Sequence, residues 1–152
     1  TPFYRQIEKF NRDYQLPIPS STINDWFVAT CTLLDPLYNK LKEKVLNTDY
    51  LQVDESPIKV MDNDKKGKTH QGYMWVYHNP LNKTILFNYR KGRGMQGPKE
   101  ILDNYKGILQ CDGYTVYDKI GKHPDISLAG CLVHVRRKYV EAKKQDPERS
   151  HD

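Results

Sequence analysis

The sequence contains no long apolar run. No stretch of its 152 residues approaches the roughly 18 consecutive apolar residues that a transmembrane helix requires. The opening residues, TPFYRQIEKF, also lack the apolar core of a signal peptide. The mean hydropathy is −0.81 and 28% of the residues are charged. These features predict a soluble protein with no membrane partner, and we expect it in the cytoplasm.

Cysteine is scarce as well. The three cysteines, Cys31, Cys111 and Cys131, are odd in number and irregular in spacing, which favours reduced cytosolic thiols over a disulfide framework. A zinc site formed by Cys111, Cys131 and His134 would match no common ligand spacing, so buried thiols are the better interpretation. The net charge of +5 favours a polyanionic partner only mildly.

The N-terminal third reads as helical. Apolar residues recur at helical spacing between residues 23 and 34, and Asp35-Pro36 predicts the start of a second helix. The segment has the length of a helix-turn-helix, but its loop lacks the usual glycine, and the pattern predicts that Trp26 and Phe27 are buried. A helical lid on the rest of the chain is therefore favoured over a reader of DNA grooves.

From residue 50 the pattern changes to strands. Segments 51–61, 72–78 and 83–90 predict an antiparallel meander, and a slip in alternation predicts a bulge near Ser56-Pro57. The later segments predict a helix from Pro98, a strand at 107–111, a helical turn near Tyr117, a strand at 126–133 and a basic helix from about Val135. This order predicts an α+β, three-layer, ribonuclease H-like domain with a mixed sheet. We expect a helical segment over 1–48 and this core over 49–152.

A glycine motif offers a competing interpretation. Gly92, Gly94 and Gly97 spell G-x-G-x-x-G, and Asp112 lies where a dinucleotide-binding turn places its ribose-binding acid. Such a turn follows the first strand of a parallel sheet, whereas the expected strand 83–90 closes an antiparallel meander. A flexible basic loop that suits phosphate is therefore favoured, with Arg90, Lys91 and Arg93 as its cations.

Two aspartates are candidates for chemistry. Asp54 lies in the middle of the first expected strand, where a carboxylate needs hydrogen bonds or a metal. Asp112 directly follows the strand 107–111, and Gly113 after it permits a sharp turn. If the first and fourth strands are neighbours, both carboxylates converge and suit Mg²⁺ or Mn²⁺. For either aspartate alone, a turn-forming role is the favoured alternative. For the two together, the metal hypothesis and the turn-forming role are about equally good.

Four motifs in order resemble a known family. The segments YLQVDESPIKVMD, GYMWVY, QCDGY and GCLVHVRRKY resemble the insertion-sequence transposases of the IS66 family. Their core carries D-E-S/T, G-Y-L/M-W-V-Y, Q-C/T-D-G-Y and G-C-x-x-H-x-R-R-K-F/Y segments. The resemblance implies a ribonuclease H-like fold and a bacterial DDE-type DNA transposase that uses Mg²⁺ or Mn²⁺. By the matching motifs, Asp54 and Asp112 would be the first and second catalytic acids and metal ligands.

The resemblance also implies DNA as the partner, both the element ends and the target, with a homo-oligomer assembling on it. The basic segment after the last strand has two interpretations of similar weight, a solvated helix face and a DNA-phosphate contact. Tyr114 and Tyr117 could stack on an unpaired base, but core packing is favoured. The expected DNA-binding residues are Arg90, Lys91, Arg93, His134, Arg136, Arg137 and Lys138.

The sequence departs from the family in one respect that affects activity. The third acid of the family, a glutamate in a D-N-N-x-x-E-R segment, does not occur in it, and no motif gives that role to Glu141. We therefore expect a fragment or remnant that is inactive by itself. Two other hypotheses stay open: a ribonuclease H-like nuclease for another nucleic acid, and a DNA-binding module that cuts nothing. The module would add Lys65, Lys66 and Lys68 to the cations above.

Overall fold

The computed structural model describes residues 1–62 and 67–145, and the chain falls into two compact units, residues 1–41 and residues from Lys42 onward. Helix α1 (Phe3–Tyr14) and most of helix α2 (Ser20–Leu46) form the first unit. The expected helical segment is thus present, while the domain boundary after residue 48 stays a prediction. None of the helices in the described ranges combines the length and hydropathy that crossing a bilayer requires.

Helix α2 passes through Pro36 without a break, so the predicted restart at Asp35-Pro36 is wrong. A proline in a helix interior removes one backbone hydrogen bond, and the long helical stretches on both sides outweigh that loss. Trp26 and Phe27 are 56% and 54% exposed, so their predicted burial is wrong too. Phe27 meets the ring of Phe3 edge-on, at 5.5 Å between centroids, but this contact does not enclose it.

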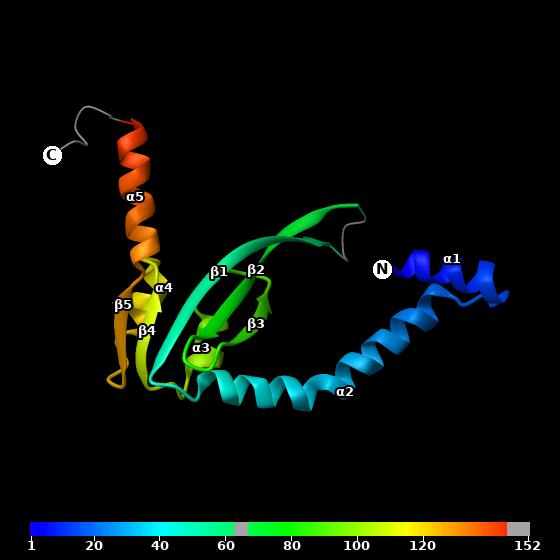
Figure 1. The fold of residues 1–152 in the computed structure, drawn as a ribbon, viewed down its shortest axis with the longest axis horizontal. Helices are drawn as coiled ribbons and strands as arrows, with labels where there is room; N and C mark the ends of the chain where they lie inside the picture. The colour runs from blue at the N-terminus through cyan, green and yellow to red at the C-terminus, as the bar shows by residue number, and fades with distance from the viewer. Residues whose placement is uncertain (63–66, 146–152) are drawn as a thin grey trace. The chain divides into compact units, whose positions relative to one another are not determined.

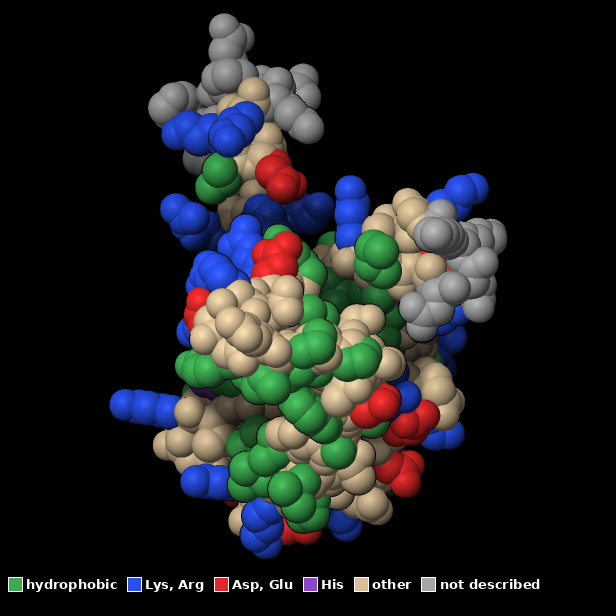
Figure 2. All heavy atoms as spheres, turned by 90° about the vertical axis from the view of Figure 1, so that its right-hand side faces the viewer, with side chains coloured by type: hydrophobic (Ala, Val, Ile, Leu, Met, Phe, Trp, Pro, Cys, Tyr) green, Lys and Arg blue, Asp and Glu red, His purple; other side chains and the backbone are tan. Residues whose placement is uncertain are grey.

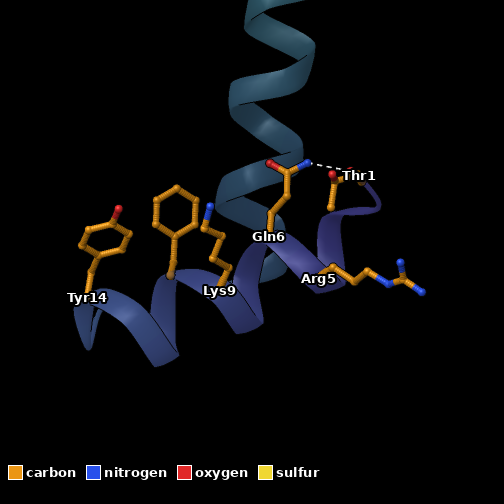
Figure 3. A pocket seen from close by; sticks show the side chains of 6 residues that line it. Thr1, Arg5, Gln6, Lys9 and Tyr14 are labelled. Atoms are coloured by element: carbon orange, nitrogen blue, oxygen red, sulfur yellow. Dashed lines mark hydrogen bonds between the residues drawn. The ribbon is translucent and has the colours of Figure 1, made fainter.

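A hollow of about 520 Å³ lies along α1 (Figure 3). Its lining consists of Thr1, Arg5, Gln6, Lys9, Phe10 and Tyr14. None of these side chains is a carboxylate, a thiol or an imidazole, so the hollow offers no ligand set for a metal. The predicted acids all belong to the second unit.

The second unit is built on a five-stranded sheet with the strand order β3-β2-β1-β4-β5 (Figure 1). Strands β1, β2 and β3 are antiparallel neighbours, and β4 and β5 continue the sheet parallel to β1. This topology confirms the predicted ribonuclease H-like mixed sheet. The elements are β1 (Tyr50–Met61), β2 (Thr69–Asn79), β3 (Thr84–Arg90), α3 (Gln96–Leu102), β4 (Gly107–Cys111), α4 (Thr115–Ile120), β5 (Ile126–Gly130) and α5 (Leu132–Gln145).

Strand β1 has no bulge at Ser56-Pro57, because its register with β2 is constant from residue 52 to residue 61. The prediction of a bulge is therefore wrong. The apolar side chains change face instead: Ile58 and Val60, on the face opposite the core, are partly covered there. Since β4 pairs only with residues 50–52 of β1, Pro57 lies on an open edge, where a residue without an N–H is tolerated.

One face of the sheet holds the core. It carries Leu51, Val53, Trp75, Tyr77, Leu86 and Leu109, all buried. Helices α3 and α4 contribute buried side chains to the same core, and the rings of Trp75 and Tyr117 meet edge-on with 6.2 Å between their centroids. The last turn of α2 joins it through the fully buried Val45, whose carbonyl accepts a hydrogen bond from Asn79 Nδ2 at 3.2 Å. The opposite face of β1 is left to the polar residues that build the site.

Gly107, the first residue of β4, provides a test of this fold. Its φ of +133° is strained for other residues, and an added Cβ would lie 2.6 Å from the Asp49 carbonyl oxygen. We expect Gly107→Ala to lower the free energy of unfolding by about 2–4 kcal/mol. Gly94→Ala is the matched control, because a Cβ there meets nothing within 4 Å. Urea denaturation measures both, and a Gly107→Ala protein as stable as the control would contradict the geometry of this strand entry.

Candidate functional site

The candidate site begins with the parallel pairing of β1 and β4. Gln52 lies opposite Gln110, and their side chains form a hydrogen bond of 2.7 Å from Gln52 Nε2 to Gln110 Oε1. Tyr50 Oη donates to the same oxygen at 2.6 Å, and His78 Nδ1 lies 2.8 Å from Gln52 Oε1. This row of polar side chains crosses three strands on the face opposite the core. It therefore stabilises the β1–β4 register from outside the core.

That register places Asp54 and Asp112 together. Each lies two residues beyond one of the paired glutamines, so both point to the same face of the sheet. Asp54 Oδ1 accepts a hydrogen bond from the Glu55 N–H, and Asp112 Oδ1 accepts one from the Tyr114 N–H, both at 2.9 Å. These bonds fix the direction of each carboxylate. Within the described residues, the second oxygen of each carboxylate makes no hydrogen bond, so it can bind a ligand.

The turn after β4 is held by Asp112 itself. Gly113 does not adopt a positive φ, and a Cβ there would meet nothing within 4 Å. The turn therefore does not use the conformational freedom that Gly113 permits. The side chain of Asp112 bonds to the backbone two residues ahead, which is the way aspartate commonly stabilises a turn.

His134 completes a cluster with the two aspartates. One ligand atom from each of Asp54, Asp112 and His134 lies within 4.8 Å of the other two. Helix α5 begins at Leu132, earlier than predicted, and this brings His134 into its first turn. Its Nδ1 is buried and has no hydrogen-bond partner. Two carboxylates and an imidazole form a donor set that suits a divalent ion of the first transition row, so these residues fit a metal.

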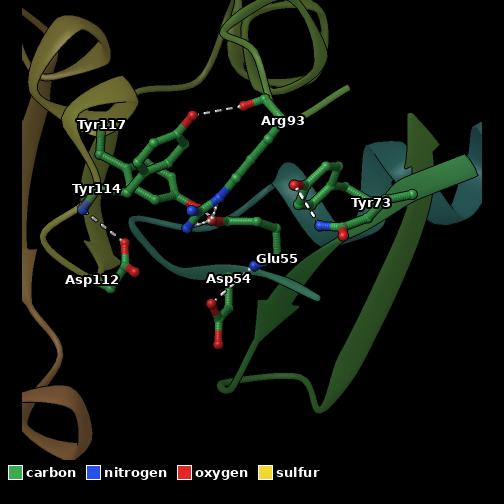
Figure 4. Close-up of polar contacts among 8 residues, drawn as sticks. Asp54, Glu55, Tyr73, Arg93, Asp112, Tyr114 and Tyr117 are labelled. Atoms are coloured by element: carbon green, nitrogen blue, oxygen red, sulfur yellow. Dashed lines mark hydrogen bonds and ion pairs between the residues drawn. The ribbon is translucent and has the colours of Figure 1, made fainter. Parts of the chain in front are cut away.

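A buried carboxylate lies behind this cluster (Figure 4). The side chain of Glu55 is 1% exposed and accepts hydrogen bonds from Arg93 Nε at 2.7 Å and from Tyr117 Oη at 2.8 Å. The guanidinium of Arg93 also lies over the ring of Tyr114, 3.9 Å from its centroid. This network attaches the loop between β3 and α3 to the turn that carries Asp112.

The charges within this network affect one another. The hydrogen bond to Glu55 raises the pKa of Arg93, which stays fully charged. Burial, followed by the negative charge of Glu55, raises the pKa of Tyr117 well above its usual range. The phenol therefore remains a donor at any physiological pH. Because Tyr117 is 1% exposed, it packs in the core rather than presenting a ring to an unpaired base.

Two hollows meet at the cluster. One, of about 370 Å³, is lined by Asp54 and Asp112, by residues 131–134, by two valines and by three side chains of the polar row, Gln52, His78 and Gln110. The other, of about 530 Å³, is lined by Asp112, His134 and three cations, Arg93, Arg137 and Lys138. Lys and Arg side chains gather on α5, below the grey C-terminal end of the chain in Figure 2. Asp112 and His134 thus line both hollows, whereas Asp54 lines only the first.

The other predicted residues are more scattered. Arg90 forms a 2.6 Å ion pair with Glu100, and Lys91 and Arg136 line neither hollow. Lys65 and Lys66 lie outside the described residues. Of the predicted DNA-binding set, the structure brings Arg93, His134, Arg137 and Lys138 to the acids, and it does not bring Arg90, Lys91 or Arg136 there.

The competing ligand sets do not form among the described residues. Cys111 and Cys131 do not join the converging ligand atoms. Burial, followed by the charge of Asp112, raises the pKa of Cys111 to about 11, so it stays a thiol, whereas metals bind the thiolate. Glu141 lines the basic hollow but lies outside the cluster, two helical turns beyond His134 and so about 10 Å along the axis. The glycine loop follows an antiparallel edge strand, which argues against a dinucleotide turn.

Sequence reasoning missed the hydrogen-bonding role of Glu55 and the position of His134 beside Asp54 and Asp112. The alternation along β1 contained the signal for Glu55, because a strand that buries Leu51 and Val53 also buries the residue two positions further on. For His134 the sequence held no comparable signal. Its position depends on a contact between strand ends, the hydrogen bond from the Cys131 N–H to the Cys111 carbonyl at 2.9 Å.

The sheet order, the strand directions and two carboxylates that face each other from adjacent parallel strands define a ribonuclease H-like domain with an acidic site. The chain belongs to the Transposase IS66 family, a family of DDE transposases, whose family model matches residues 1–152. This match confirms the resemblance carried by the four sequence motifs.

Two similar proteins come from Sinorhizobium fredii. The uncharacterized protein y4jD is 26% identical over 156 residues, which cover 94% of this chain and 30% of that protein. The uncharacterized protein y4qI is 29% identical over 154 residues, covering 92% and 28%. The chain therefore spans about 30% of the length of these relatives.

Among solved structures, a chain of the simian T-cell lymphotropic virus intasome in complex with the PP2A regulatory subunit B56 gamma is similar over 65% of this chain and 42% of its own length. The TM-score is 0.39 and the sequence identity is 10%. A similarity this low carries no argument about the fold or the function of this chain.

The ion pair behind the acids can be tested by a double-mutant cycle of Arg93→Ala and Glu55→Gln. Because Glu55 is buried and Arg93 is 42% exposed, we expect a coupling of about 1–2 kcal/mol in the free energy of unfolding, below the value for a fully buried pair. The matched pair is Arg90→Ala and Glu100→Gln, whose side chains are 29% and 45% exposed and should couple more weakly, because solvent screens an exposed ion pair. Equal couplings in the two cycles would contradict a structural role for Glu55.

Proposed function

We propose that this chain supplies the catalytic centre of a DDE-type DNA transposase, in which Asp54 and Asp112 are the first and second catalytic acids and hold Mg²⁺ or Mn²⁺. The observation that carries the proposal is the convergence of these two carboxylates on one face of adjacent parallel strands, in a chain of the Transposase IS66 family. A divalent ion bound there supplies activation of an attacking hydroxyl and stabilisation of the leaving oxygen of a phosphodiester.

The residues of the chain prepare this chemistry before any ion binds. The backbone N–H groups of Glu55 and Tyr114 each occupy one oxygen of an acid, which leaves the other oxygen directed to a ligand. Preorientation of this kind lowers the reorganisation that the reaction requires. The network of Glu55 and Arg93 then keeps the turn of Asp112 from shifting relative to β1.

The basic hollow supports DNA as the substrate. Arg137 and Lys138 line it on the side of α5, and Asp112 lies at its edge. Because these cations share a hollow with Asp112, they can bind the phosphates on both sides of a scissile bond, with release of counterions. Arg93 is shared with Glu55, so its contact with a phosphate would compete with the ion pair. We propose DNA ends and target DNA as the partners, bound by a homo-oligomer.

The reaction as a whole is proposed for a polypeptide of the length of the relatives, since this chain spans about 30% of them. Glu141 lies outside the cluster, so the third acid of the family has no counterpart among the described residues. For that reason we propose that the 152-residue chain binds duplex DNA with little sequence preference and does not cut it. Its affinity should fall steeply as salt rises.

The test measures strand transfer by a protein as long as the relatives that carries Asp54→Asn or Asp112→Asn. Asparagine keeps the shape of the side chain but removes the charge that holds the ion. We therefore expect strand transfer to fall on the order of a thousandfold or more, since the members of such a site act as a unit. DNA affinity at fixed salt should stay the same or rise, because only negative charge is lost.

Asp103→Asn is the matched control, because Asp103 is exposed at the end of α3 and does not line either hollow at the acids. It should transfer strands as the unmodified protein does. Normal strand transfer in either the Asp54 or the Asp112 variant would contradict the proposed assignment of the acids.

A further inference from the structure

His134 stands apart from the other histidines of the described residues. His70 has a buried Nδ1 without a partner too, but its Nε2 lies 3.1 Å from Tyr89 Oη. His78 Nδ1 bonds to Gln52 Oε1, and His123 Nδ1 accepts from the Asp125 N–H. Neither ring nitrogen of His134 makes a hydrogen bond within the described part of the chain, and its Nδ1 is buried. A buried polar atom without a partner costs free energy, so this ring has capacity for a ligand.

The backbone around His134 directs it to the acids. The Cys131 N–H donates to the Cys111 carbonyl at 2.9 Å, which joins the end of β5 to the end of β4. The His134 N–H donates to the Cys131 carbonyl at 3.1 Å as α5 begins. Three residues after Cys131, the imidazole therefore lies beside the residue that follows Cys111, which is Asp112.

We propose that His134 is a ligand of the ion held by Asp54 and Asp112, a role that rests on the proposed function of those acids. Two atoms bound to one ion at about 2.1 Å are at most about 4.2 Å apart. The three ligand atoms already lie within 4.8 Å of one another. Three atoms spaced evenly around one ion are about 3.6 Å apart, so side-chain rotations that move these atoms by roughly an ångström would close the set.

The ligand set determines which ion the site prefers. Carboxylates alone suit Mg²⁺, whereas an imidazole nitrogen suits the first-row transition ions better. The structure therefore assigns a preference for Mn²⁺ over Mg²⁺ to this site and attributes that preference to His134. Contact of His134 with a DNA phosphate is the competing role, and it would give no preference between ions in the absence of DNA.

The experiment measures ion binding by the 152-residue chain without DNA. Isothermal titration gives the affinities for Mn²⁺ and Mg²⁺, and electron spin echo envelope modulation of bound Mn²⁺ detects a directly bonded nitrogen. The variants are His134→Ala, His134→Asn and Asp54→Ala. The matched control is His123→Ala, because His123 lines neither hollow at the acids and its Nδ1 already accepts a hydrogen bond from the Asp125 N–H. Circular dichroism checks that each variant is folded.

We expect a nitrogen signal from Mn²⁺ bound to the unmodified chain and to His123→Ala, and none from either His134 variant. The affinity for Mn²⁺ should fall about tenfold or more in the His134 variants, with a smaller loss for Mg²⁺. Asp54→Ala should lose both ions.

The two proposals fail in different ways. If Asp54→Ala loses the ion but the His134 variants keep both the affinity and the nitrogen signal, His134 is not a ligand and the acids retain their proposed role. If Mn²⁺ does not bind the unmodified chain, or binds Asp54→Ala equally well, the assignment of the acids fails together with that of His134.

Discussion

The parallel pairing of β1 with β4 places Gln52 beside Gln110, and the geometry of the site follows from that register. Side chains alternate between the faces of a strand, so a slip of one residue would move Asp112 to the face that holds the core. Hydrogen bonds among Tyr50, Gln52, Gln110 and His78 stabilise the register on the polar face. The fully buried Leu51 and Leu109 stabilise it on the other.

The elements outside this strand pair depend on it in turn. Glu55 follows Asp54 and points to the core side, where it holds Arg93 and thereby the loop before α3. Cys131 bonds to the end of β4 and sets the start of α5, which brings His134 and the cations of that helix to the acids. A short parallel pairing of two strands thus positions two carboxylates, an imidazole and the cations of a basic hollow, although these side chains come from distant parts of the sequence.

Much of this arrangement could be predicted from the sequence, because apolar alternation and turn residues define strands locally. The strand at 107–111 and the two aspartates were identified in this way, and the family motifs supported them. Other features depend on contacts that the local pattern does not contain. The predicted start of α5 near Val135 is wrong because Leu132 and Val133 also suit a strand. Tertiary contacts decide whether these two residues are in the strand or in the helix. Along β1, the apolar side chains change from one face of the sheet to the other without a bulge. The sequence alone does not distinguish these two cases, because the difference depends on which face the rest of the chain covers.

The most direct measurement is the anomalous diffraction of crystals of this chain grown with Mn²⁺. The account predicts one strong peak at about 2.2 Å from a carboxylate oxygen of both Asp54 and Asp112. That peak would place the two acids of adjacent strands on a shared ion. A peak bound by only one of these aspartates, or a peak only at other acidic residues, would contradict the claim that the β1–β4 register builds a metal site.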